Sequence, residues 1–121
     1  PVPDVFKVTP LAAVAEAVLK ITGRYPEVDV QRFTNEDWYQ IKSKNAAKET
    51  AVAAVCEALG ITMNDAAAFG DDLNDAGMLR ACGVGVAVAN AIGETRAAAG
   101  WFCRDCDDDG VAHWIEENIL L

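Results

Sequence analysis

The chain has 121 residues, of which 52% are hydrophobic and 24% charged, a composition typical of a compact globular domain and not of a disordered tail. Its 19 acidic residues against 10 basic ones give a formal net charge of −9, so the average surface repels a phosphate backbone. No apolar run approaches the length that crosses a bilayer, and the first residues lack the basic and apolar regions of a secretory signal. Neither nucleic acid nor a membrane is therefore an expected partner.

The four cysteines are too few for a disulfide-stapled scaffold. Cys56 and Cys82 lie in apolar, helix-like contexts, where a reduced thiol serves as a small hydrophobic side chain. We therefore expect a soluble protein of the reducing cytoplasm.

The chain opens with signals for a short strand and an amphipathic helix. An apolar stretch at 5–8 precedes Thr9 as a possible N-cap and Pro10 at the first helical position, and Gly23 ends the helix. The apolar face of this helix would consist of four residues at helical spacing: Leu11, Val14, Val18 and Ile21.

Two strand-like runs follow, at 28–34 and 38–43. The polar residues 35–37 between them are typical of the connection in an antiparallel hairpin. The first third of the chain is thus predicted as strand, helix, strand, strand. Near residue 42 the pattern changes, which marks the only plausible domain boundary.

From Asn45 onward, helices alternate with short strands that are apolar on both faces. The first helix carries an apolar stripe and is closed by Gly60, and the stripe consists of Val52, Val55, Cys56 and Leu59. The further elements are expected as a strand at 66–69, a helix at 76–81, a strand at 84–88, a helix at 94–99, a strand at 101–103 and a helix from about 111. This alternation predicts an α/β fold with a parallel sheet covered on two sides by helices.

Three carboxylates and an amide crowd into five residues after the strand at 66–69, namely Asp71, Asp72, Asn74 and Asp75. Ligands of parallel α/β sheets bind beyond the carboxyl ends of the strands, and hard divalent cations prefer oxygen ligands. Capping of the next helix explains one or two of these residues but not all of them. We expect Asp71 to hold a metal ion, with Asp75 contributing directly or through water.

Lys48 lies on the same helical face as the apolar stripe, at spacings of four, seven and eleven residues from Val52, Val55 and Leu59. A lysine aligned with a buried stripe needs an anion, and a phosphate held between Lys48 and the carboxylate-bound metal would supply one. The alternative is a lysine whose ammonium reaches water past the end of the stripe.

Together these segments resemble the C-terminal motifs of the haloacid dehalogenase superfamily, in particular the Cof-type phosphatases. The resemblance runs from Lys48 to Ala112 and is carried by Lys48, Leu59-Gly60-Ile61, Phe69-Gly70-Asp71-Asp72-Leu73-Asn74-Asp75, Met78-Leu79, the segment from Gly83 to Ala91, and Asp109-Gly110-Val111-Ala112. It implies the C-terminal part of a Rossmann-like hydrolase core at 42–121. Residues 1–41 look more generally like part of the α/β cap that sets specificity in such enzymes.

The resemblance also implies roles for individual residues. Asp71 would be a Mg²⁺ ligand, with Asp75 supporting the metal shell beside Asp72. Lys48 would bind the transferring phosphoryl group, Asn74 would contact phosphate, and Asn90 would lie on the rim of the site. The implied reaction is magnesium-dependent hydrolysis of a small phosphorylated metabolite, such as a sugar phosphate, through an aspartyl-phosphate.

The family's nucleophile, the first aspartate of an Asp-x-Asp motif, is not found in residues 1–41. The spacing recurs only at Asp105-Cys106-Asp107, where the family has a polar loop, and this stretch is interpreted as a solvated turn. We therefore expect this chain alone to be inactive, because its nucleophile would lie outside the sequence.

Cys103 and Cys106 form one Cys-x-x-Cys pair with His113 seven residues on, which is one ligand short of a structural zinc site. A packing or surface role for His113 is favoured over catalysis.

One further interpretation remains open, and another is disfavoured. The chain could be a complete, non-catalytic module with a degenerate fold of the same family that binds a metal ion or a phosphorylated ligand. A phosphoacceptor receiver domain also combines carboxylates, magnesium and a lysine, but there the lysine follows the acidic residues, whereas Lys48 precedes Asp71. The sequence does not name the substrate, and an exposed sheet edge would favour pairing with another copy of the chain.

Overall fold

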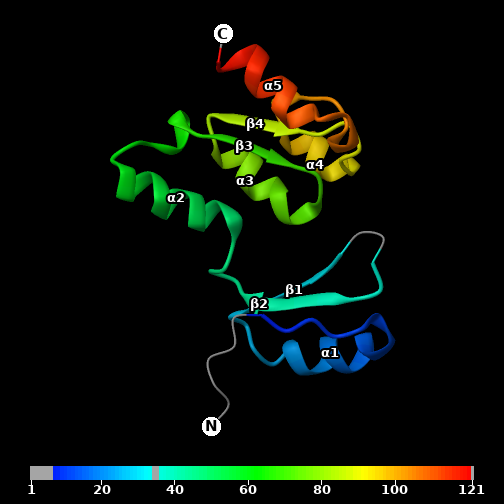
Figure 1. The fold of residues 1–121 in the computed structure, drawn as a ribbon. Coiled ribbons are helices and arrows are strands. Elements are labelled where there is room, and N and C mark those ends of the chain that lie inside the picture. The colour runs from blue at the N-terminus through cyan, green and yellow to red at the C-terminus, as the bar shows by residue number, and fades with distance from the viewer. Residues whose placement is uncertain (1–6, 34–35, 121) are drawn as a thin grey trace. The chain divides into compact units, whose positions relative to one another are not determined.

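The computed structural model describes residues 7–33 and 36–120. The chain divides into two compact units, Pro1–Ala46 and Ala47–Leu121 (Figure 1). The domain boundary predicted from the sequence lies near residue 42, a few residues before this division.

The first unit contains helix α1 (Ala15–Thr22) and the antiparallel hairpin of β1 (Val28–Arg32) and β2 (Tyr39–Ser43). The hairpin confirms the prediction for this part of the chain. The segment before α1 lies against the other edge of β2 through two antiparallel bridges, Val8 to Ile41 and Leu11 to Trp38. Residues 5 and 6 of the first predicted strand lie outside the described residues.

The helix of this unit begins later than the sequence predicts. Pro10 accepts a hydrogen bond from the backbone N–H of Tyr39, and Leu11 is still extended, with φ −67° and ψ 151°. A short 3₁₀ turn at Ala12–Val14 then leads into α1. Backbone pairing with β2 therefore overrides the capping signals of Thr9 and Pro10, and of the four predicted face residues only Val18 is buried.

The second unit alternates helices and parallel strands, as the sequence predicts. Its elements are α2 (Lys48–Leu59), β3 (Ala67–Gly70), α3 (Ala76–Ala81), β4 (Val84–Ala87), α4 (Gly93–Ala98), β5 (Trp101–Phe102) and α5 (Gly110–Asn118). The described strands form one sheet in the order β3-β4-β5, and both pairings are parallel. The α/β fold class with helices flanking a parallel sheet is thus confirmed.

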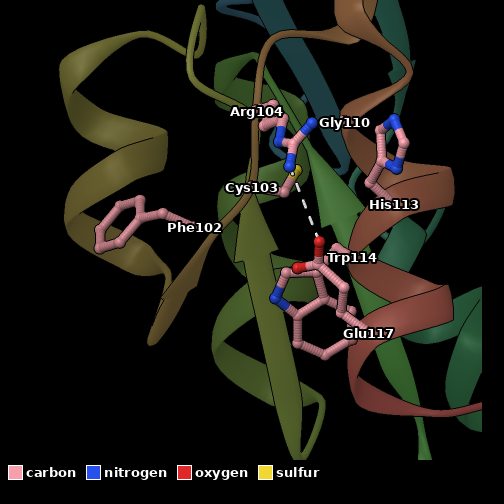
Figure 2. Close-up of a pocket in the computed structure, with 7 residues that line it drawn as sticks. All are labelled: Phe102, Cys103, Arg104, Gly110, His113, Trp114 and Glu117. Atoms are coloured by element: carbon pink, nitrogen blue, oxygen red, sulfur yellow. Dashed lines mark ion pairs between the residues drawn. The ribbon is translucent and has the colours of Figure 1, made fainter. Parts of the chain in front are cut away.

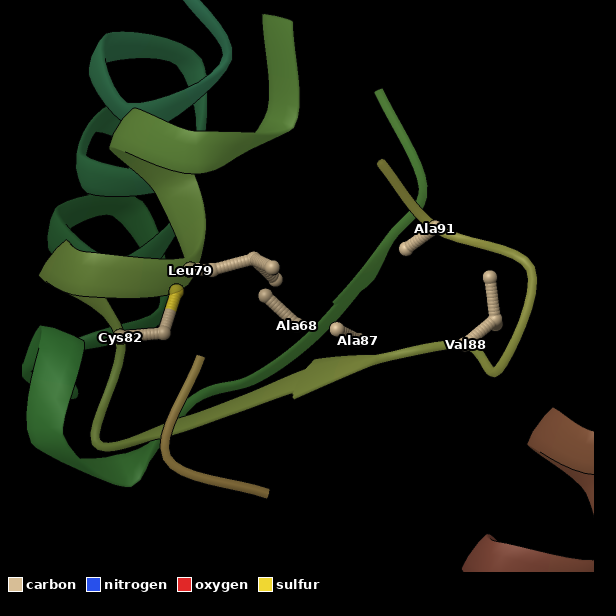
Figure 3. Close-up of a cluster of buried hydrophobic side chains, with 6 residues drawn as sticks. All are labelled: Ala68, Leu79, Cys82, Ala87, Val88 and Ala91. Atoms are coloured by element: carbon tan, nitrogen blue, oxygen red, sulfur yellow. The ribbon is translucent and has the colours of Figure 1, made fainter. Parts of the chain in front are cut away.

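Small side chains let α3 pack closely on this sheet. The buried cluster consists of Ala68, Leu79, Cys82, Ala87, Val88 and Ala91 (Figure 3). A Cβ atom at Gly85 of β4 would lie 2.1 Å from the backbone oxygen of Leu79, so only glycine permits this approach of helix and strand.

Helix α2 differs from the prediction in what it buries. Cys56 is buried and Val52 is half-buried, but Val55 is 57% exposed and Leu59 is 68% exposed. The expectation of a continuous buried stripe along this helix is therefore wrong, because two of its four residues are exposed in this chain. In the part of the chain that the structure describes, no helix combines the length and the apolar character that a bilayer span requires.

Thr95 of α4 is the least accessible polar side chain of the core. It is 0% exposed, and its hydroxyl oxygen has no hydrogen-bond partner among the described residues. A buried hydroxyl without a partner loses its hydration without compensation.

Replacing this hydroxyl by a methyl group should therefore stabilise the fold. We predict that Thr95→Val raises the free energy of unfolding by about 1 kcal/mol in chemical denaturation, because valine has nearly the same shape and no polar atom to satisfy. Thr50→Val, at an exposed position of α2, serves as the control and should change little. A loss of stability in Thr95→Val alone would mean that the hydroxyl has a partner in solution.

Candidate functional site

The crowded carboxylates lie where β3 ends, in the loop that leads into α3. Asp72 begins a short 3₁₀ turn, Leu73–Asp75, because its carboxylate accepts a hydrogen bond from the backbone N–H of Leu73 at 2.7 Å. The turn carries directly into α3. Capping, which the sequence allows for one or two of the acidic residues, thus involves Asp72 and also Asp75, whose carboxylate accepts from the Asp72 backbone N–H.

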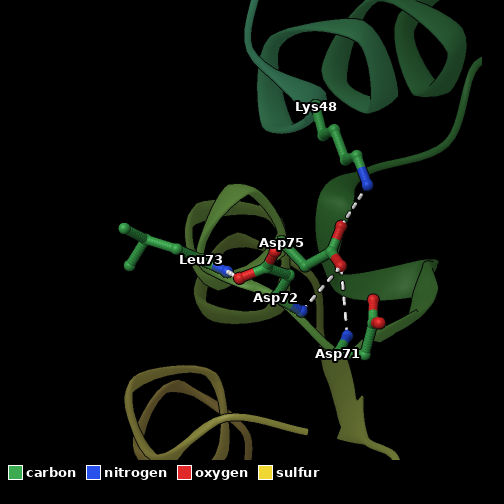
Figure 4. Close-up of polar contacts among 5 residues, drawn as sticks. All are labelled: Lys48, Asp71, Asp72, Leu73 and Asp75. Carbon is green, nitrogen blue, oxygen red and sulfur yellow. Dashed lines mark hydrogen bonds and ion pairs between the residues drawn. The ribbon is translucent and has the colours of Figure 1, made fainter. Parts of the chain in front are cut away.

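Asp75 folds back under this loop and is only 2% exposed. Its Oδ2 atom accepts hydrogen bonds from the backbone N–H groups of Asp71 at 3.1 Å and of Asp72 at 3.4 Å. Its Oδ1 atom accepts from the ammonium of Lys48 at the start of α2 (Figure 4). A buried carboxylate is thereby supplied with one cation and two backbone donors, which offsets the cost of removing it from water.

Burial alone would raise the pKa of Asp75, but the hydrogen bond from Lys48 and those from the Asp71 and Asp72 backbone outweigh it and hold the pKa below its ordinary value. Asp75 is therefore ionised at neutral pH. Its charge fixes Lys48 at the same end of the sheet as Asp71.

The pKa of Asp71 is shifted in the opposite direction from that of Asp75. Partial burial raises the pKa of its carboxyl, and the neighbouring carboxylates of Asp75 and Asp72 raise it further, while Lys48 lowers it. The carboxylate group is exposed at the end of β3. A hard divalent cation would relieve this repulsion, and oxygen donors of this kind are the ligands that Mg²⁺ prefers, so the residues present fit such an ion.

A cavity of about 290 Å³ adjoins Asp71. Its walls are Phe69, Gly70, Asp71, Val88, Cys106 and Val111. The loops that follow the strands meet here, because the backbone N–H of Ile92 donates to the Asp71 carbonyl oxygen at 3.0 Å. The candidate site therefore opens at the carboxyl edge of the sheet, as expected for a parallel fold.

The structure brings some of the sequence-predicted residues together and leaves others apart. Lys48, Asp71, Asp72 and Asp75 form one group (Figure 4). Asn74 lies half-buried in the 3₁₀ turn between them. Asn90 is exposed after β4 and donates from Nδ2 to the sulfur of Cys106 at 3.1 Å, a contact that the sequence did not suggest.

The expectation that Lys48 needs an anion because it aligns with a buried stripe is wrong. The apolar stripe with which it aligns is exposed at Val55 and Leu59, so burial of a stripe does not demand an anion there. Lys48 is itself 48% exposed and takes Asp75 as its anionic partner. Its ammonium carries three donors, so further acceptors can bind beside Asp75.

Gly70 is a positioning residue that sequence reasoning passed over. A Cβ atom there would lie 2.4 Å from Cβ of Asp75 and 2.8 Å from its Cγ. The absence of a side chain at Gly70 is what lets Asp75 fold back under the loop. The signal was available, because a glycine stands directly before Asp71 at the end of an apolar strand.

The weaker metal signals do not assemble into a zinc site. Within the described residues, the group of three or more metal-type ligands in mutual reach is Asp105, Cys106 and Asp107, all in one loop. Cys103 and His113 are not part of it. Cys106 and Asp107 are exposed and Asp105 accepts from the backbone N–H of Asp107, which agrees with a solvated turn.

Comparison with known proteins identifies the family. Residues 4–115 match the sequence model for haloacid dehalogenase-like hydrolases. The chain belongs to this family. Among similar proteins of Bacillus subtilis (strain 168), this haloacid dehalogenase-like chain is 38% identical to the stress response protein YhaX over 101 residues, which cover 84% of the chain and 35% of YhaX. It is 36% identical to phosphatase YwpJ over 81 residues, which cover 67% of the chain and 28% of YwpJ.

Solved structures of the haloacid dehalogenase-like family have the same fold. A haloacid dehalogenase-like hydrolase from Bacteroides thetaiotaomicron superposes with a TM-score of 0.82 at 26% identity, covering 96% of this chain and 45% of that one. The sugar phosphatase BT4131 of subclass IIB superposes with a TM-score of 0.79 at 25% identity, covering 94% and 43%. The chain thus spans less than half the length of these relatives.

The close approach of Gly70 and Asp75 yields a prediction for this haloacid dehalogenase-like site. Gly70→Ala should lower the free energy of unfolding by about 1 to 3 kcal/mol, the range for forcing an extra methyl group into a packed site, because the collision is with Cβ of Asp75 and not with a flexible side-chain end. Gly100→Ala is the matched control, since a Cβ atom at Gly100 meets nothing within 4 Å. Equal stability of the two variants in denaturant titrations would contradict this packing.

Proposed function

We propose that the chain is the C-terminal portion of a magnesium-dependent phosphatase that hydrolyses small phosphate monoesters, with sugar phosphates as the leading substrate class. The observation that carries this proposal is the pairing of Lys48 with the buried Asp75 directly beside the exposed Asp71. One end of the sheet thereby offers both a cation for phosphate and a carboxylate for a metal ion.

Each residue has a role in this proposal. Asp71 is the principal Mg²⁺ ligand, Asp75 supports the metal shell by fixing the loop and Lys48, and Asp72 adds negative charge beside them. Lys48 binds the transferring phosphoryl group, and Asn74 contacts phosphate. The bound ion would neutralise charge on the phosphate group.

Asn90 completes the rim of the site in this proposal. Its contact with Cys106 holds the loops after β4 and β5 together, and Cys106 shares a cavity wall with Asp71. A small phosphorylated molecule bound near Asp71 would meet this rim.

The attacking aspartate of the aspartyl-phosphate reaction would come from a part of the protein outside these residues. The groups in this chain position the phosphate and neutralise its charge, which does not replace an attacking atom. The 121 residues alone are therefore inactive in this proposal. Since the chain spans less than half the length of the two solved structures described above, it would be a segment of a longer enzyme in this proposal.

The substrate class rests on the relatives. One structural neighbour is named as a sugar phosphatase, and YwpJ is named as a phosphatase. In this proposal residues 1–41 are part of a cap that selects the substrate. The free thiols of Cys56 and Cys82, both buried, fit the reducing cytoplasm as the location.

Strand β3 lies at one end of the sheet order, with β4 as its partner among the described strands. An unpaired strand edge offers backbone donors and acceptors to another strand. We propose that the remainder of the longer protein covers this edge, and that the isolated chain pairs there with a second copy of itself.

The metal site can be tested in this chain by the direction in which Asp71→Asn changes the melting temperature, first without Mg²⁺ and then with it. Without metal, Asp71→Asn should raise the melting temperature at pH 7, because it removes a charge that Asp75 and Asp72 repel. With Mg²⁺, the wild type should gain stability and Asp71→Asn should not, because ligand binding stabilises only the variant that binds. Asp108→Asn is the control and should follow the wild type. Equal Mg²⁺ responses of wild type and Asp71→Asn would contradict the assignment.

Activity should be measured in the longer protein with a panel of sugar phosphates. Lys48→Met keeps most of the apolar stem, so it should retain the fold while turnover falls by about two or more orders of magnitude, the scale of losing one preorganised charge partner. Lys44→Met, at an exposed position ahead of α2, is the matched control and should keep its activity. Mg²⁺ binding without turnover in the unmodified longer protein would favour the non-catalytic binding module instead.

A further inference from the structure

The cavity between the segment after β5 and helix α5 has no part in the proposed phosphatase site. It measures about 310 Å³, a size within the range of small-molecule sites. Its lining consists of Phe102, Cys103, Arg104, Gly110, His113, Trp114 and Glu117 (Figure 2). None of the carboxylates after β3 is among these residues.

Two features of the backbone build this cavity. The α5 residues of the wall follow one another at helical spacing, so a single face of the helix lines it. A Cβ atom at Gly110 would lie 2.1 Å from the backbone oxygen of Arg104, so glycine lets the first turn of α5 approach the opposite wall. Cys103 and His113, for which the sequence favours no metal site, are both wall residues here.

The floor of the cavity is aromatic. Trp114 is 9% exposed, and edge contacts with Phe69 and Trp101 fix its ring, at centroid distances of 5.4 Å and 6.2 Å. Burial raises the pKa of the Cys103 thiol, so this part of the wall is uncharged. A flat or large apolar group would find a rigid, neutral surface here.

The mouth of the cavity carries charged side chains that are exposed and form only long ion pairs with one another or with neighbours. Arg104 and Glu117 are each 60% exposed and face one another with Nη2 and Oε1 3.7 Å apart, longer than a hydrogen bond (Figure 2). His113 beside them pairs at 3.8 Å with Glu116, which does not line the cavity. Exposed ion pairs of this kind contribute little to stability. A ligand could therefore separate Arg104 from Glu117 and bind both side chains with little loss of free energy.

We propose that this cavity binds a zwitterion with an apolar side chain, that is, an α-amino acid of the aromatic class. The guanidinium of Arg104 takes the carboxylate, the carboxylate of Glu117 takes the ammonium, and Trp114 packs against the side chain. An anion alone would meet Glu117 in a chain of net charge −9, and a cation alone would meet Arg104. Only a molecule that carries both charges matches both walls.

The test uses L-phenylalanine as the probe and saturation-transfer NMR on the whole chain. Two analogues each lack one charge: 3-phenylpropionate lacks the ammonium and 2-phenylethylamine lacks the carboxylate. Phenylalanine should bind about ten-fold more tightly than either analogue, because each lost charge-assisted contact is worth about that factor.

Two variants assign each charge to its wall residue. In Arg104→Gln, phenylalanine should bind no better than 2-phenylethylamine, and in Glu117→Gln no better than 3-phenylpropionate. Binding of the matched analogue shows that each variant is still folded. Arg80→Gln and Glu94→Gln, at exposed positions outside the cavity, are the matched controls and should keep the ten-fold preference.

The proposal is overturned if the wild type shows no transfer to phenylalanine, if it binds the three ligands equally, or if the two wall variants behave like their controls. The readout is binding and not turnover, so its failure leaves the phosphatase proposal untouched.

Discussion

The ion pair between the half-exposed Lys48 and the buried Asp75 is the contact on which the site depends. One oxygen of Asp75 binds the ammonium and the other accepts two backbone N–H groups of the loop, so a single carboxylate fixes both the loop and the start of α2. Removing Lys48 would leave the buried Asp75 carboxylate with its two backbone donors and no cation, which is more costly than losing an exposed pair. The pair also leaves Asp71 as the accessible carboxylate at the end of β3.

The fold supports this contact by keeping the surrounding residues small. Gly70 has no side chain where Asp75 folds back, and Gly85 admits α3 close to β4. The 3₁₀ turn started by Asp72 directs Asp75 inward. Local capping, close packing and electrostatics therefore act on the same few residues, and the repulsion that remains at Asp71 is what a divalent cation would remove.

The alternation of elements in the second unit could be predicted because each strand is a short apolar run and the helices are separated from them by clear stop signals. The start of α1 could not, since Thr9 and Pro10 give strong local signals and yet Pro10 hydrogen-bonds to Tyr39, a long-range pairing invisible in a local window. The cluster of acidic side chains after β3 was predictable, because three aspartates stand within five residues of the sequence. The partner of Lys48 was not, because periodicity places a residue on a face without showing what that face contacts.

The most direct test of this account is a crystal structure of the chain soaked in Mn²⁺, an ion of similar oxygen preference whose anomalous scattering locates it. We predict that the ion lies within coordination distance of the Asp71 carboxylate and that the Lys48 ammonium is still bound to Asp75. An ion on Asp75 with Lys48 displaced, or no ion at Asp71, would contradict the division of roles between the two carboxylates.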